Sequence, residues 1–307
     1  MHLALYTHVS CLEHDPGSGH PESPARLQAV LEALDGDRFA GLDRIEAPRA
    51  TRTQLELAHH GEHVAQIFAL APAAGSWLRI DADTVMSPAS LDAALRAAGA
   101  VCAAVDGVLA ARHKRAFCAV RPPGHHATAA EAMGFCLFNN VAVGARHALA
   151  CGLARVAIVD FDVHHGNGTQ DIFASDARVL YASTHEMPLY PGTGLRGETG
   201  AGNIVNEPLP PGSGGSEFRA AYRDRVLPAL DAFAPQLLFV SAGFDAHRLD
   251  PLANLNLAAE DYAWVTQELV ALAEKHAHGR IVSSLEGGYS LTALRQSVQA
   301  HVAALLD

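Results

Sequence analysis

Short apolar runs alternate with amphipathic segments along the chain. The apolar runs have the length and β-branched content of buried strands, and they read LALYTH, RAFCAV, RVAIVDFDV, VLYAST, QLLFVSAGF and RIVSSLEG. Between residues 90 and 110 apolar positions recur at the i, i+3, i+4 spacing of a helix, at Leu91, Leu95, Ala98, Cys102, Val105 and Leu109. Further helices are expected near residues 140–151, 216–233, 258–277 and 290–306.

This alternation predicts an α/β fold. Strands separated by helices form crossover units, which build a mainly parallel sheet with helices on both faces. The richest Gly/Pro stretch, EPLPPGSGGSE at residues 207–217, is short and is expected to be a loop. No linker divides the chain and no repeat is found, so residues 1–307 are expected to form one domain.

Composition narrows the classes of function. The formal net charge is −11, which argues against a nucleic-acid-binding surface and suits cationic substrates. The five cysteines are an odd number without a C-x-x-C pair, as expected for reduced thiols in the cytoplasm. No segment reaches the ~18 consecutive apolar residues of a membrane span, so no membrane association is expected. Oligomeric state is left open.

Polar clusters follow four of the predicted strands, in RPPGHHA, DFDVHHGNGT, SAGFDAH and LEGGYS. Ligands of open α/β sheets bind beyond the carboxyl ends of the strands, so these clusters should converge. In extended backbone Asp160, Asp162 and His164 share one face. Asp162 and His164, with Asp245, can supply three metal ligands and leave a fourth position open, as in a catalytic zinc site. The same three residues could instead form an internal ion-pair network.

His125 and His126 are the candidates for general acid and base catalysis, since imidazole titrates near neutral pH. Asp160 is placed to orient one of them, and Asn167 the other. Because a carboxylate favours the imidazolium more than an amide does, the two histidines are expected to differ in basicity. Tyr289 follows two glycines and could donate a hydrogen bond to a developing oxyanion.

The motifs RPPGHHA, GFCLFNN, DFDVHHGNGTQDIF, YPGTG, SAGFDAH followed by DPL, and LEGGY occur together and in this order. With them the chain, from GHPESPAR to Tyr289, resembles the zinc-dependent histone deacetylases and acetylpolyamine amidohydrolases. The resemblance implies a three-layer α/β/α arginase/deacetylase fold with a mainly parallel central sheet of about eight strands. It also implies one zinc ion per chain, held by Asp162, His164 and Asp245, with His125 and His126 as the proton-transfer pair and Tyr289 polarising the carbonyl.

Finer assignments rest on the resemblance alone. Asn167 is typical of the class II branch, whereas another branch has aspartate there. Arg26 matches an arginine at the base of an acetate cavity. A structural potassium ion is implied near Asp160, Asp162, His164 and the Ser183 hydroxyl. Walls of a substrate channel are implied at Gly134, Phe135 and Tyr190, the last of which is phenylalanine in many relatives.

The expected reaction is hydrolysis of N-acetylated amines with release of acetate. Polyamine-specific relatives often carry an acidic residue near the channel mouth. The corresponding Leu252 is apolar, which favours acetyl-lysine in peptides or proteins over acetylpolyamines. Glu13, His14 and Asp15 are alternative residues for a rim that recruits a cation. The physiological substrate stays open.

Three other functions compete with this one. HHGEH at residues 59–63 fits a metalloprotease pattern, but Gly61 weakens the helix that would present the ligands. A dinuclear manganese arginase needs more aspartates than SAGFDAH supplies with Asp245. A catalytically inactive acyl-lysine-binding module should have lost a ligand or Tyr289, and neither is lost.

Overall fold

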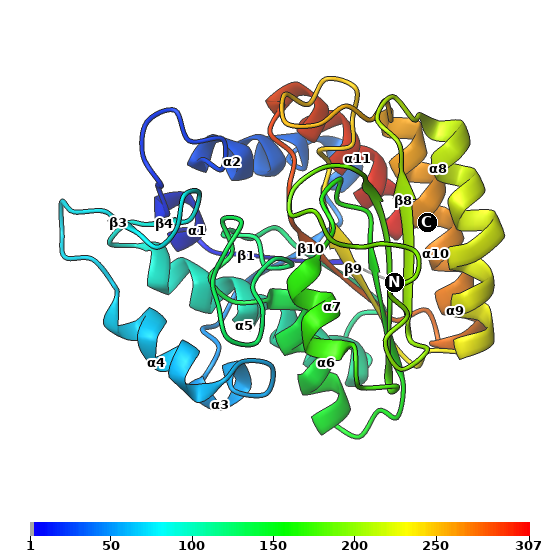
Figure 1. Cartoon of the computed structure of the whole chain (residues 1–307), viewed down its shortest axis with the longest axis horizontal. Helices are drawn as coiled ribbons and strands as arrows, with labels where there is room; N and C mark the ends of the chain where they lie inside the picture. The colour runs from blue at the N-terminus through cyan, green and yellow to red at the C-terminus, as the bar shows by residue number, and fades with distance from the viewer. Residues whose placement is uncertain (1–2) are drawn as a thin grey trace.

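An eight-stranded parallel sheet forms the centre of the computed structural model, which describes residues 3–307 (Figure 1). The strand order is β2-β1-β5-β10-β9-β6-β7-β8, and every neighbouring pair is parallel. The strands are β1 (Leu3–Thr7), β2 (Asp43–Glu46), β5 (Arg115–Cys118), β6 (Val156–Asp160), β7 (Val179–Glu186), β8 (Ile204–Leu209), β9 (Leu238–Ala242) and β10 (Ile281–Leu285). The α/β class expected from the sequence is confirmed.

Helices cover both faces of the sheet (Figure 1). One face carries α5 (Ser90–Leu109), α6 (Asn140–Ala150) and α7 (Asn167–Phe173). The other carries α2 (Pro24–Ala33), α8 (Gly215–Ala221), α9 (Leu227–Phe233), α10 (Ala259–His276) and α11 (Leu291–Leu306). A π-helical turn, Tyr222–Val226, joins α8 to α9, so the single helix expected at 216–233 has an irregular centre.

The first third of the chain adds smaller elements beside this core. They are α1 (Ser10–Glu13), a 3₁₀ turn (Asp37–Phe39), α3 (Arg52–Leu55), α4 (Gly61–Ala69) and the hairpin of β3 (Leu78–Arg79) and β4 (Val85–Met86). Among residues 3–307, none of the helices is long and apolar enough to cross a membrane.

The predicted loop at 207–217 is wrong at both ends, because α8 already begins at Gly215. Residues 207–209 belong to β8, where Pro208 pairs in register with His185 of β7. β8 lies at the edge of the sheet, and an edge strand tolerates proline because only one side of it must bond to a neighbour.

The sheet order explains why the polar clusters meet. β5, β10, β9 and β6 are consecutive neighbours, and all point the same way. The segments that follow these strands therefore all leave the sheet at the same end, where the strands terminate. They are RPPGHHA, LEGGYS, SAGFDAH and DFDVHHGNGT. Because β6, β9 and β10 are buried along their whole length, this end of the sheet is rigidly supported.

Candidate active site

Asp162, His164 and Asp245 form a compact group of metal-ligating side chains. Their ligand atoms lie within 4.8 Å of one another. His164 Nδ1 is 3.1 Å from Asp162 Oδ1 and 3.2 Å from Asp245 Oδ2. Asp160 ends β6 and lies outside this group, because the chain leaves the strand after it.

The three residues fit a divalent cation. Both carboxylates are buried, and Asp245 Oδ2 has no hydrogen-bond partner among the described residues. Burial raises the pKa of Asp245 to about 7, and the nearby Asp162 carboxylate adds to the rise. A side chain at Gly287 would collide with Oδ2 of both aspartates, so this glycine leaves space beside them. Two oxygen donors, one imidazole nitrogen and an open position suit zinc.

His125 and His126 lie beside this group with different partners. The Nδ1–H of His125 donates to Asp160 Oδ2 at 3.0 Å, whereas that of His126 donates to Asn167 Oδ1 at 2.8 Å. Burial opposes the charged form of His125, but the Asp162 and Asp160 carboxylates raise its pKa to about 10. Burial and the neighbouring charge of His125 hold the pKa of His126 well below its ordinary value. The pair therefore combines a proton donor with a proton acceptor.

The loop that carries the histidines is hydrogen-bonded to Glu286, the residue after β10. Oε2 of Glu286 accepts from the backbone N–H of Gly124 at 2.6 Å and of His125 at 3.2 Å. Glu286 is fully buried, and its other oxygen accepts from Ser241 Oγ at 3.2 Å. The sequence analysis gives this glutamate no role, because the histidine loop that it binds lies more than a hundred residues away in the chain.

Tyr289 faces the same pocket from the segment after β10. Its backbone N–H donates to Asp250 Oδ2 at 2.7 Å, and the Arg26 guanidinium lies 4.8 Å from the ring centroid. Arg26 is fully buried and donates through Nε to the Gly288 carbonyl at 2.6 Å. Burial raises the pKa of Tyr289 well above its ordinary value, so the phenol keeps its proton at neutral pH.

A cavity of about 350 Å³ opens above these groups. It is lined by His20, Pro21, Ala82, Asp83, Pro123, His125, His126, Gly134, Phe135, His164, Leu189, Tyr190, Leu252, Gly287 and Tyr289. All four residues expected in the substrate channel are thus brought together. A side chain at Gly134 would collide with the His126 ring, and Tyr190 and Leu252 are partly exposed at the mouth.

The residues at the rim of the cavity differ from those expected. His14 is buried, with Nε2 3.2 Å from Glu22 Oε2, so it cannot form the rim, and neither Glu13 nor Asp15 lines the cavity. The acidic residue at the cavity is Asp83, in the turn between β3 and β4. No strand-end signal marks that turn, so sequence inspection missed it.

Ser183 lies beside Asp160, its partner in the register of β6 and β7. Its hydroxyl is 2.9 Å from His185 Nδ1. The potassium ion stays a prediction.

The histidines of the HHGEH motif bond to the backbone of the loops beside the active site. Nδ1 of His59 is 2.9 Å from the Thr128 carbonyl, and its Nε2 accepts from Asn139 N–H at 2.9 Å. His63 Nε2 is 2.9 Å from the Leu137 carbonyl. α4 begins at Gly61, in the middle of the motif, so the residues do not share one helical face.

The parallel sheet, its two helical layers and the pocket at the strand ends define the class of the arginase/deacetylase fold. The histone deacetylase domain family matches residues 20–305. A probable deacetylase from Archaeoglobus fulgidus is 40% identical over 297 residues, which are 95% of this chain and 82% of that protein. A histone deacetylase-like amidohydrolase from Pseudomonas aeruginosa is 41% identical over 280 residues, 89% of this chain and 73% of that protein.

Structure comparison agrees with the sequence matches. The crystal structure of the HDA15 HD domain matches with a TM-score of 0.94 at 37% identity, over 99% of this chain and 88% of that one. The chain therefore belongs to the histone deacetylase family, and the expected resemblance and fold are confirmed.

Proposed function

We propose that the protein is a zinc-dependent deacetylase that hydrolyses the amide of acetyl-lysine in peptides or proteins and releases acetate. The observation that carries the proposal is the meeting of three components at one cavity, which His164, His125, His126 and Tyr289 line. The components are the donor group of Asp162, His164 and Asp245, the oppositely tuned histidine pair, and the Tyr289 phenol.

The residues divide the chemistry among them. A zinc ion held by the donor group supplies Lewis-acid polarisation of the amide carbonyl and lowers the pKa of a water molecule. His126, neutral and with Nδ1–H committed to Asn167, accepts the proton of the attacking water at Nε2. His125, held protonated by the Asp162 and Asp160 carboxylates, donates to the leaving amine. Tyr289 donates to the carbonyl oxygen as it gains negative charge.

The cavity walls are suited to a linear acyl-lysine chain. Phe135, Tyr190 and Leu252 provide apolar surface for methylene groups. Leu252 brings no charge to the mouth for the internal ammonium of a polyamine. The five free cysteines support a reducing cytoplasm as the compartment.

Asp83 favours a second candidate, an acetylpolyamine amidohydrolase. It is an acid at the cavity that a polyamine ammonium could pair with, and the net charge of −11 attracts polycations over long range. A third candidate, a binding module without activity, would hold acylated ligand and release no acetate.

Acetate release by the zinc-loaded protein distinguishes the three. An acetyl-lysine peptide, N-acetylputrescine and N-acetylspermidine are compared, with metal-stripped protein as control. Faster zinc-dependent turnover of the peptide supports the proposal. Preference for the polyamines, abolished in Asp83→Asn and kept in the exposed control Glu13→Gln, supports the second candidate. No turnover after zinc is restored contradicts both.

A further inference from the structure

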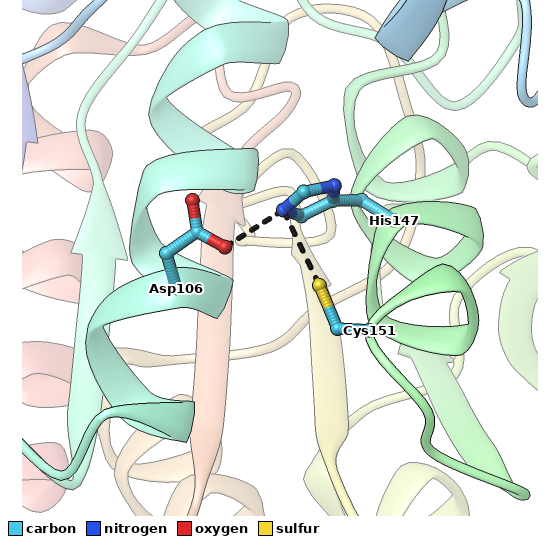
Figure 2. Close-up of side chains that lie close together, drawn as sticks. All are labelled: Asp106, His147 and Cys151. Atoms are coloured by element: carbon cyan, nitrogen blue, oxygen red, sulfur yellow. Dashed lines mark hydrogen bonds and ion pairs between the residues drawn. The ribbon is translucent and has the colours of Figure 1, made fainter.

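A second cluster of metal-ligating side chains lies outside the active site. Asp106, His147 and Cys151 point toward one another from two neighbouring helices (Figure 2). Asp106 Oδ1 is 2.8 Å and Cys151 Sγ 3.8 Å from the same atom, His147 Nε2. Figure 2 shows the other ring nitrogen on the far side, away from both partners.

The cluster stands at two helix C-termini. Asp106 is in the last turn of α5, His147 is in the last turn of α6, and Cys151 caps α6. α6 starts at Asn140, directly after the loops of the active site. Its C-terminal end therefore lies at the opposite end of the sheet, where the strands begin. Helix C-termini carry partial negative charge, which disfavours an aspartate there and favours a cation.

A hydrogen bond between His147 and Asp106 satisfies two of the three side chains and leaves the Cys151 sulfur with a long contact to the same nitrogen. His147 Nε2 carries at most one proton, yet a carboxylate oxygen and a sulfur both approach it. If Nε2 is deprotonated, its lone pair faces the Asp106 carboxylate. Partial burial, together with the Asp106 charge, raises the pKa of Cys151, so the thiol keeps its proton without a cation. A metal ion would satisfy all three donors at once.

We propose that Asp106, His147 and Cys151 bind a divalent transition-metal ion of the zinc class, at a site separate from the catalytic centre. One sulfur, one imidazole and one carboxylate are a zinc-type ligand set, with a fourth position for water. Binding releases the thiol proton and any proton on Nε2.

The geometry needs only small adjustments. Tetrahedral zinc bonds of ordinary length place Sγ about 3.6 Å and Oδ1 about 3.4 Å from Nε2. The sulfur is already near that distance, and the carboxylate must withdraw by about half an ångström. The Asp106 side chain is 50% exposed, so it can rotate, and the ion can enter from solvent.

Cobalt(II) distinguishes this site from the catalytic one. The catalytic donors are oxygen and nitrogen only, so a thiolate-to-cobalt charge-transfer band can arise only where a cysteine is bound. Titrating metal-stripped full-length protein with Co²⁺ should produce the band. Cys151→Ser and His147→Gln should abolish it, while zinc-loaded acetate release stays at the wild-type level.

Two controls complete the test. Asp245→Asn should keep the band although it loses turnover, which separates this site from failure of the proposed function. Cys102→Ser tests the other thiol near the cluster, which lies one turn before Asp106 in α5. Burial and the charges of Asp106 and Cys151 raise the pKa of Cys102 to about 12. The band should survive that change.

A measurement that leaves Asp106, His147 and Cys151 unchanged covers the case in which a variant of one of these residues does not fold. Cys151 is exposed and the other four cysteines are buried. Zn²⁺ added to Asp245→Asn protein should slow alkylation of Cys151 by about tenfold or more, because the bound thiolate is shielded. No band at saturating Co²⁺, a band that persists in Cys151→Ser, or unchanged alkylation overturns the proposal.

Discussion

Replacing Tyr289 by phenylalanine removes one hydroxyl and leaves the ring in place. The ring contacts survive the change, with Phe135 edge-to-face at 5.9 Å between centroids and the Arg26 guanidinium at 4.8 Å. The backbone bond from Tyr289 N–H to Asp250 Oδ2 does not involve the hydroxyl. The variant should therefore fold, with a free energy of unfolding within about 0.5 kcal/mol of wild type.

We expect the substitution to lower kcat and to leave KM nearly unchanged. The phenol keeps its proton because burial raises its pKa, so it is a full donor to an oxygen that gains charge in the transition state. Removing one such donor costs about 10²- to 10³-fold in kcat, or about 3–4 kcal/mol. KM should change little, because the ground-state carbonyl carries little of that charge.

The assay is steady-state acetate release by zinc-loaded enzyme with an acetyl-lysine peptide, alongside thermal unfolding. Tyr262→Phe is the matched control, since it removes a buried hydroxyl that has no hydrogen-bond partner among the described residues and lies outside the cavity lining. A Tyr289→Phe enzyme with kcat within about threefold of wild type would refute the oxyanion role. A loss shared with Tyr262→Phe would mean that the effect is structural.

Three further predictions follow from the site and the core. Gly287→Ala should weaken catalytic metal binding, measured by competition with a chelator, because its Cβ would collide with both aspartates; unchanged affinity would contradict the fit. Asn167→Asp should raise the pKa of His126 and shift the acidic limb of kcat/KM to higher pH, because a carboxylate favours imidazolium; an unmoved limb would exclude His126 as the base. Burial lowers the pKa of His301 to about 3, so unfolding binds a proton below about pH 6.5. Its contribution to stability is present above that pH and declines by up to about 1.4 kcal/mol per unit as pH falls toward 3. The free energy of unfolding, measured with urea at pH 7 and pH 5, should fall less between these two pH values in His301→Gln than in wild type. An equal fall in both proteins would contradict this.

The strands that the sequence predicts correctly are those buried on both faces. Their runs are mostly apolar, as in β6 and β9, and such runs can be recognised without knowledge of the neighbouring strands. β2 and β8 were missed because edge strands mix polar with apolar positions, and Pro208 argues for a loop when read alone. Only the register with β7 shows that these residues extend the sheet.

The same limit applies to the site. Residues directly after a strand, such as Asp162 and Tyr289, were identified because strand ends of a parallel sheet converge. Residues that reach the cavity from distant segments leave no strand-end signal, as with Asp83 from a hairpin and His20 from an N-terminal loop. The pairing of Glu286 with the backbone of His125 joins positions 161 residues apart, which no spacing rule could reveal.

The two adjacent histidines show what spatial partners add to a motif. In the sequence they are identical neighbours; in the fold one imidazole meets a carboxylate at 3.0 Å and the other an amide at 2.8 Å. Their ring centroids are 4.0 Å apart, so a proton on His125 disfavours a second proton on His126. The mechanism proposed above uses such unlike neighbours, since one accepts a proton while the other holds one. Because the two titrations are coupled, a bell-shaped pH profile would describe the pair, and only a change of partner, at Asp160 or Asn167, can assign a limb to one ring.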